Sequence, residues 1–243
     1  MALRVVQVFL LALWMAFFIW LPTFGQTHLA RLLHPRLWWL LFAGAGITMV
    51  FLLVTLSRCW RGGPLAQISL RWQWPSLMIL LLPMLYVYPL GTARLDSNAF
   101  NRLATRTNGG FAQGELIPES LEVVPFAQEG SEGQRDISLT RLYAQQKLYL
   151  GKSVEVVCQL LKDDALPEGL SICYRFTIFC CAADARPVFV FLNSAQSLAQ
   201  YATDDWLRVQ GFLSVHEHNG LRTLQIQPEH IQQVEEPLFP FVF

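Results

Sequence analysis

The chain has 243 residues, of which 53% are apolar and only 15% are charged, against roughly 25% charged residues in an ordinary soluble domain. The net charge is zero, but residues 1–95 hold seven arginines and no acidic residue, whereas residues 96–243 hold 11 bases and all 18 acids. The composition excludes a disordered chain, which needs low hydrophobicity. Five cysteines are also too few for a small disulfide scaffold.

The acid-free part begins with two uncharged apolar segments, residues 5–22 and 37–56. Each approaches the length of about 20 residues that crosses a bilayer as a helix. Trp38 and Trp39 open the second segment and Arg58 follows it, an arrangement typical of the membrane interface. We therefore expect two transmembrane helices here. A cleaved signal peptide is the alternative for the first segment.

A third segment, residues 74–91, is apolar but contains Pro83, which should kink a helix by removing one hydrogen bond. The alternatives are a third span and a re-entrant or interfacial helix. The excess of arginines in the short loops favours the amino terminus inside the cell. Three spans then place the carboxyl-terminal half outside the cytoplasm, and two spans place it inside.

The sequence divides into a transmembrane region at 1–94, a polar linker at 95–135 and a water-facing domain at 136–243. In the last part, Asp136 or Ser138 can cap a helix that runs to about residue 148, and Gly151 closes it. Alternating hydrophobicity then predicts strands and one short helix. The predicted strands are 154–160, 171–181, 187–192, 206–215, 221–227 and 231–234, and the short helix is 194–202.

Two turn features refine this prediction. Gly211 interrupts a strand, as a bulge or barrel corner does, and Asn219 with Gly220 is typical of a hairpin turn. Five or six strands in about 85 residues fit a small mainly-β barrel of the OB type. A two-layer sandwich is the alternative. The excess of acids in this half argues against a nucleic-acid partner, because phosphate binding needs a basic groove.

Adjacent cysteines, Cys180 and Cys181, are the most specific local feature. Neighbouring residues in a strand point to opposite faces, so the two thiols can share one ion only if the backbone bends. The small residues that follow, up to Asp184, would permit such a bend. The alternatives are two buried thiols that pack as apolar groups, a transition-metal or redox site, and a vicinal disulfide.

His216 and His218 lie two residues apart, which places both imidazoles on one face of a strand, a spacing that suits metal ligation. Exposed turn histidines are the alternative. The predicted metal ligands are therefore Cys180, Cys181, His216 and His218. No phosphate-binding loop or hydrolase motif occurs in the sequence, and the predicted spans contain no acidic or basic side chain. We therefore expect no enzyme, and no transporter by this chain alone.

The chain resembles the bacterial YcgQ-type two-domain membrane proteins over nearly its whole length. The resemblance is carried by short motifs spread along the chain, the most specific being Cys180-Cys181-x-Ala183-Asp184-Ala185. The others are Pro89-Leu90-Gly91, Leu95-Asp96-Ser97, Gly151-Lys152-x-Val154-Glu155-Val156, Arg175-Phe176-x-Ile178, Trp206-x-x-Val209-x-Gly211 and a tail with Pro237 and Pro240. The tail ends in Phe243 and departs from the tyrosine-rich end expected of the family.

The resemblance implies a non-catalytic accessory subunit of a membrane permease complex. Its partner would be a polytopic YraQ-type permease, and it would lie in membrane lipid. The implied location is the bacterial plasma membrane, with several spans and the carboxyl-terminal domain outside the cytoplasm. The family pattern singles out Cys180, Cys181 and Asp184 without assigning them a role. The alternative function is a membrane-anchored metal- or thiol-handling protein that uses Cys180 and Cys181.

Overall fold

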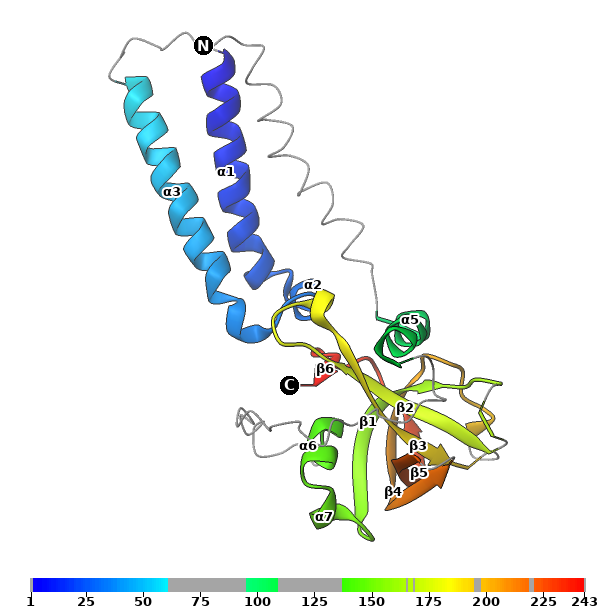
Figure 1. The fold of residues 1–243 in the computed structure, drawn as a ribbon. Helices are drawn as coiled ribbons and strands as arrows, with labels where there is room; N and C mark the ends of the chain where they lie inside the picture. The colour runs from blue at the N-terminus through cyan, green and yellow to red at the C-terminus, as the bar shows by residue number, and fades with distance from the viewer. Residues whose placement is uncertain are drawn as a thin grey trace. The chain divides into compact units, whose positions relative to one another are not determined.

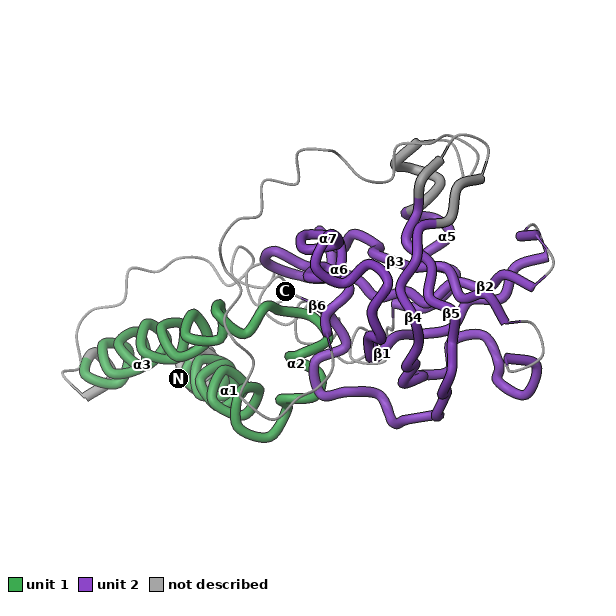
Figure 2. The backbone as a smooth tube through the Cα atoms, turned by 90° about the horizontal axis from the view of Figure 1, so that it is seen from below, with its two compact units in different colours: residues 1–94 green, residues 95–243 purple. Residues whose placement is uncertain are grey.

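The computed structural model describes residues 2–60, 95–108, 137–164, 166–167, 169–194, 198–218 and 221–242. The chain forms two compact units, Met1–Arg94 and Leu95–Phe243, which are coloured separately in Figure 2. The predicted third span at 74–91 lies outside the described residues, as does most of the predicted linker.

The part of the first unit that the structure describes consists of helices and turns (Figure 1). Helix α1 spans Ala2–Thr23, and the short helix α2 spans Gln26–Ala30. The 3-10 turn η1, Pro35–Leu37, leads into helix α3, Trp39–Trp60. The two apolar segments predicted as spans are therefore both helical.

Helices α1 and α3 lie side by side (Figure 1). Gly44 of α3 faces the ring of Phe18, and a Cβ atom at this position would meet that ring at 3.4 Å. Thr48 donates its hydroxyl hydrogen bond to carbonyls of its own helix, so its polar group is satisfied within α3. The absence of a side chain at Gly44 therefore leaves room for the ring of Phe18 between the two apolar helices. Small residues also allow close packing between helices in membranes.

Within the described part of the chain, Pro35–Ser57 is the one helical stretch that is both long and apolar enough to cross a membrane. Val8–Thr23 is a shorter apolar stretch. Length and composition thus agree with the second predicted span, the first predicted span falls short of this length, and membrane insertion stays a prediction.

The second unit begins with helix α5, Ser97–Asn108, which falls in the predicted linker. Helices α6, Leu139–Ala144, and α7, Gln146–Tyr149, replace the single predicted helix because the chain breaks at Gln145. Six strands and one 3-10 turn follow. They are β1 Ser153–Leu161, β2 Leu170–Thr177, η2 Ala182–Asp184, β3 Arg186–Asn193, β4 Trp206–His218, β5 Leu221–Gln233 and β6 Phe241–Val242.

The strands close into a barrel. Their order is β1-β4-β5-β3-β2-β6, and β1 also pairs with β2, so five strands form a ring. The pairing of β3 with β5 is parallel and the other pairings in the ring are antiparallel. This mixed five-stranded barrel is OB-like, and its closure excludes the two-layer sandwich.

Two strand boundaries differ from the prediction. Strand β2 ends at Thr177 rather than at Cys181, because the chain turns there toward β3. The predicted separate strand at 231–234 is largely the end of β5, because its residues continue to pair with β4. The predicted bulge at Gly211 is confirmed, since the β4–β5 register shifts between Gln210 and Gly211. The predicted helix at 194–202 lies partly outside the described residues.

Two apolar clusters hold this unit together. The first lies inside the barrel and includes Val156, Leu160 and Val209, with Leu139 and Leu142 of α6. Alternating residues of β2 form the second cluster, which lies against α5. It includes Ile172, Tyr174, Phe176 and Phe100, and the last of these is fully buried. The period-two pattern therefore separates the two faces of β2 as predicted.

Candidate metal site

Cys180 and Cys181 lie in the connection between β2 and β3, outside any strand. Strand β2 has already ended at Thr177, and the turn η2 begins directly after Cys181. The alanines of η2 present no bulky side chain, so the backbone can reverse within a few residues. The prediction of a strand up to Cys181 is therefore wrong, and the backbone bend on which a shared ion depends is present at this point.

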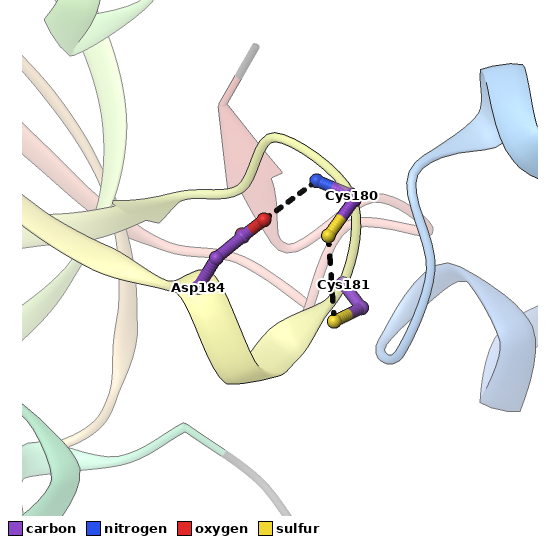
Figure 3. A group of neighbouring side chains, drawn as sticks. All are labelled: Cys180, Cys181 and Asp184. Atoms are coloured by element: carbon purple, nitrogen blue, oxygen red, sulfur yellow. Dashed lines mark hydrogen bonds between the residues drawn. The ribbon is translucent and has the colours of Figure 1, made fainter.

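Asp184 closes the loop (Figure 3). One carboxylate oxygen accepts the backbone N–H of Phe179 at 3.0 Å, and the other accepts the N–H of Cys180 at 2.8 Å. The side chain is thereby held beside the two cysteines.

The two thiols lie close together. The Sγ atom of Cys180 donates to the Sγ atom of Cys181 at 3.6 Å, as the dashed line in Figure 3 shows. The two sulfur atoms and a carboxylate oxygen of Asp184 all lie within 4.8 Å of one another. Cys180 is exposed, and the other two residues are half-buried. The site is a surface cluster that an ion can reach from solvent.

The charge state of the cluster follows from its hydrogen bonds. The hydrogen bonds of Cys180 with Asp184 and then with Cys181 raise the pKa of the Cys180 thiol to about 11. Desolvation acts to raise the pKa of Asp184, but its hydrogen bonds from Cys180 and Phe179 together lower that pKa below its ordinary value. At neutral pH the free site therefore holds a protonated Cys180 thiol beside a carboxylate. This is a poor arrangement for a nucleophile.

The other two predicted ligands, His216 and His218, lie in β4. Their backbones pair with Thr223 and Leu221 of β5. Their side chains lie outside what the structure describes, so their part in a metal site stays a prediction. The three neighbouring ligands that the structure brings together are Cys180, Cys181 and Asp184.

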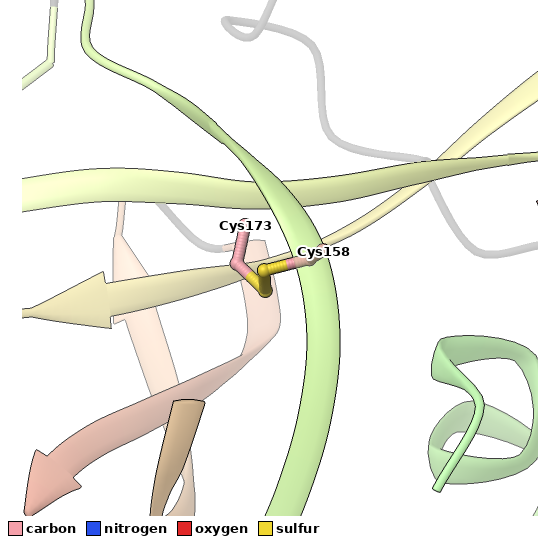
Figure 4. Close-up of a disulfide and its surroundings, with 2 residues drawn as sticks. All are labelled: Cys158 and Cys173. Atoms are coloured by element: carbon pink, nitrogen blue, oxygen red, sulfur yellow. A yellow bond between two sulfur atoms is a disulfide. The ribbon is translucent and has the colours of Figure 1, made fainter. Parts of the chain in front are cut away.

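A buried disulfide joins Cys158 of β1 to Cys173 of β2 (Figure 4). Both residues are fully buried in the barrel interior. The pairing of Leu160 with Cys173 places the two cysteines diagonally across neighbouring strands, with Cα atoms 5.4 Å apart. Sequence analysis missed this bond. Both cysteines lie in predicted strands, but only the strand register shows that they meet.

The fold and the cluster define a small OB-like barrel domain with two thiols and a carboxylate on one connecting loop. Residues 137–243 match the family model described as "DUF1980 C-terminal domain". The carboxyl-terminal part of the chain is therefore similar to an uncharacterised family, and the match includes the cluster. No curated protein matches the chain.

Solved structures match at low similarity. A Leishmania major Friedlin protein assigned as an aspartyl-tRNA synthetase shares 14% identity over 47% of this chain and 24% of its own, with a TM-score of 0.29. The small single-stranded DNA-binding protein of Streptomyces coelicolor shares 16% identity over 34% of this chain and 91% of its own, with a TM-score of 0.25. The priB protein of Ralstonia solanacearum shares 19% identity over 34% of this chain and 97% of its own, with a TM-score of 0.21. Scores this low carry no argument about function.

Proposed function

We propose that the chain is a membrane-anchored protein whose barrel binds a thiophilic divalent ion, with Zn²⁺ as the expected metal. The observation that carries this proposal is the convergence of Cys180, Cys181 and Asp184 within 4.8 Å. Thiolate and carboxylate are both established ligands of this ion. Binding would displace the thiol proton, because the thiolate is the form that ligates metals.

The spacing of the sulfur atoms favours tetrahedral coordination. A tetrahedral ion with metal–sulfur bonds of about 2.3 Å holds its two sulfurs about 3.8 Å apart, whereas a linear ion with similar bonds holds them roughly 4.6 Å apart. The sulfur atoms of Cys180 and Cys181 are 3.6 Å apart. A tetrahedral ion would therefore require a smaller change in the distance between the two sulfur atoms than a linear ion would.

Three ligands on an exposed loop leave a fourth position for water or for another protein. Structural zinc sites are usually closed by four protein ligands, whereas sites with three keep an open position. A site with an open position suits an ion that is transferred to another protein. His216 and His218 remain predicted ligands for the fourth position.

Anchorage rests on α1 and α3, whose sequences between residues 5–21 and 39–56 contain no ionisable side chain. The buried disulfide between Cys158 and Cys173 supports a location outside the cytoplasm for the barrel, because disulfides persist in oxidising compartments. We propose that the protein lies in a plasma membrane with its barrel on the outer side.

Cobalt titration of the full-length chain in detergent tests the metal site, because Co²⁺ bound by thiolates gives a charge-transfer absorbance. We expect one ion per chain, competed off by Zn²⁺. Cys180→Ser and Cys181→Ser should each weaken the thiolate band, their double substitution should abolish it, and Asp184→Asn should weaken binding by roughly 10-fold or more. Asp164→Asn removes an exposed carboxylate outside the cluster, and serves as the matched control that binds normally.

Equal cobalt binding by wild type and Cys180→Ser would reject the site. Near-ultraviolet circular dichroism of each variant shows whether the barrel remains folded. The three substituted side chains are exposed or half-buried, so we expect the fold to survive.

A second candidate is the accessory subunit of a YraQ-type permease, which the resemblance implies. The uncharged helices α1 and α3 favour this role, because they supply no polar path for a substrate and would have to dock on another protein. Co-purification from mild detergent with a YraQ-type permease tests it. A protein that runs alone in the presence of that permease contradicts it.

A further inference from the structure

A surface of the barrel domain combines bases with large apolar side chains that face solvent. It is formed by α6, α7, the turn that follows them and the neighbouring part of β4, and we call it the basic face. Its apolar members are Leu148 at 58% exposure, Leu150 at 38% and Phe212 at 46%. Its basic members are Arg141, Lys147 and Lys152, and all three are exposed.

The fold explains why these side chains point outward. Helix α6 turns Leu139 and Leu142 into the barrel core, which leaves Arg141 on the solvent side. Helix α7 has no buried residue. The side chains of this short helix therefore contribute little to the core. The exception is the ring of Tyr149, which is partly buried against the core.

Backbone hydrogen bonds bring the turn and β4 together. The N–H of Gly151 donates to the carbonyl of Leu213 at 2.8 Å, and the N–H of Leu213 donates to the carbonyl of Lys152 at 3.0 Å. Ser153 pairs with Phe212. The exposed ring of Phe212 therefore belongs to the same surface as the leucines of the turn.

The charge of this face differs from that of the rest of the unit. Residues 137–154 contain three bases and no acid, whereas residues 96–243 hold 18 acids against 11 bases. The next residue, Glu155, pairs with Arg208 at 3.3 Å and is engaged by that contact. The basic face is thus a positive surface on an acidic domain.

We propose that the basic face binds the surface of a lipid bilayer that contains anionic headgroups. Lysine and arginine beside exposed leucine and aromatic side chains are the combination by which proteins bind a membrane interface. Each base near an anionic surface contributes about fivefold to binding. This inference rests on the membrane anchorage proposed above, because the tether makes a weak contact intramolecular and so raises its occupancy.

Hydrogen exchange of the full-length chain in lipid nanodiscs tests the inference. Discs of phosphatidylcholine are compared with discs that also contain phosphatidylglycerol. We expect the amides of residues 146–152 to exchange at least about fivefold more slowly in the anionic discs. Incorporation into either disc, scored by gel filtration, reports the anchorage separately, and the metal site takes no part in the measurement.

Three variants complete the test. Charge reversal of Arg141, Lys147 and Lys152 to glutamate should abolish the difference between the discs, whereas Arg186→Glu, an exposed base outside this face, should preserve it. Leu148→Ser with Leu150→Ser should reduce the protection. Unchanged exchange in β1 shows that each variant is folded. Exchange that is equal in the two kinds of disc overturns the inference.

Discussion

Asp204 has a left-handed backbone conformation, with φ at 72°, which costs a non-glycine residue about 1–2 kcal/mol. Its carboxylate accepts three hydrogen bonds. They come from the backbone N–H of Ser97 at 2.8 Å, the hydroxyl of Ser97 at 2.8 Å and the hydroxyl of Tyr174 at 2.6 Å. These bonds join the start of α5 to the barrel and outweigh the backbone strain.

The buried tyrosines predict a loss of stability at alkaline pH. Burial, and then the hydrogen bond to Asp204, raise the pKa of Tyr174 far above its ordinary value, and burial raises that of Tyr143. A group with a raised folded pKa stabilises the fold fully below its unfolded pKa, which is about 10 for tyrosine, and the contribution is lost as the pH rises above it. Urea unfolding between about pH 8 and pH 11 should therefore show a falling free energy of unfolding. Tyr174→Phe should flatten this fall, and a curve parallel to wild type contradicts the prediction.

Gly211 is required by space rather than by backbone conformation. A Cβ atom there would lie 2.1 Å from the carbonyl oxygen of Gln227, which is backbone and cannot move cheaply. Gly211→Ala should therefore lower the free energy of unfolding by about 3 kcal/mol or more. Gly151→Ala is the contrast, because its φ is +73° but nothing lies within 4 Å of the added atom, and its cost should be about 1–2 kcal/mol. Thermal denaturation of both variants checks that Gly211→Ala is the more destabilising substitution. Equal losses of stability in the two variants would contradict this prediction.

At the scale of elements, β1 and β2 are joined by the Cys158–Cys173 disulfide across 15 residues of chain. In the connection between these strands, Leu166 packs against the second apolar cluster. The bond constrains the unfolded chain and holds together the two strands that close the barrel.

Removal of this disulfide should lower the free energy of unfolding by about 3 kcal/mol, the value expected for a loop of this length. Cys158→Ala with Cys173→Ala should show this in urea unfolding. Cys180→Ser with Cys181→Ser changes two cysteines outside the core and should leave stability within about 0.5 kcal/mol of wild type. A large loss of stability in the Cys180 and Cys181 variant, with none in the Cys158 and Cys173 variant, would contradict the assignment of the two cysteine pairs.

At the scale of the whole molecule, charge separates the chain into two parts. All 18 acids follow residue 95, and the boundary between the two compact units lies at Arg94 and Leu95. Ionised carboxylates are costly in lipid but harmless on a barrel that faces water. The composition therefore favours a membrane unit followed by a water-facing unit.

The proposed location of the barrel predicts a labelling pattern in whole cells. A membrane-impermeant maleimide should modify the exposed thiol of Cys180 in intact cells, without prior lysis. The experiment uses a Cys59→Ser background, because Cys59 is the fifth cysteine of the chain. Replacing Cys180 and Cys181 by alanine in that background should remove the label, because Cys158 and Cys173 are bonded to each other. Labelling that appears only after lysis would place the barrel on the cytoplasmic side.

Much of the barrel could be predicted from local pattern. Alternation predicts β1 and the two faces of β2, and Gly211 predicts the bulge, because side-chain period and steric freedom are local properties. Helix α5 could not be predicted, because its sequence is polar and small. Its fully buried Phe100 is held by contacts with β2, far away in sequence. The end of β2 was predicted wrongly, at Cys181 instead of Thr177, for the same reason, because it depends on the turn toward β3.

The amino-acid sequence alone determined where apolar helices and strands occur, since hydrophobic periodicity and charge are properties of residues that are close together in the sequence. Tertiary structure alone decided which cysteines meet. Cys158 bonds to Cys173 because the β1–β2 register places them on one side of the barrel wall. Cys180, Cys181 and Asp184 converge because the chain reverses between β2 and β3. Contacts between distant strands and the path of a loop depend on the closed barrel, and no short stretch of sequence contains that information.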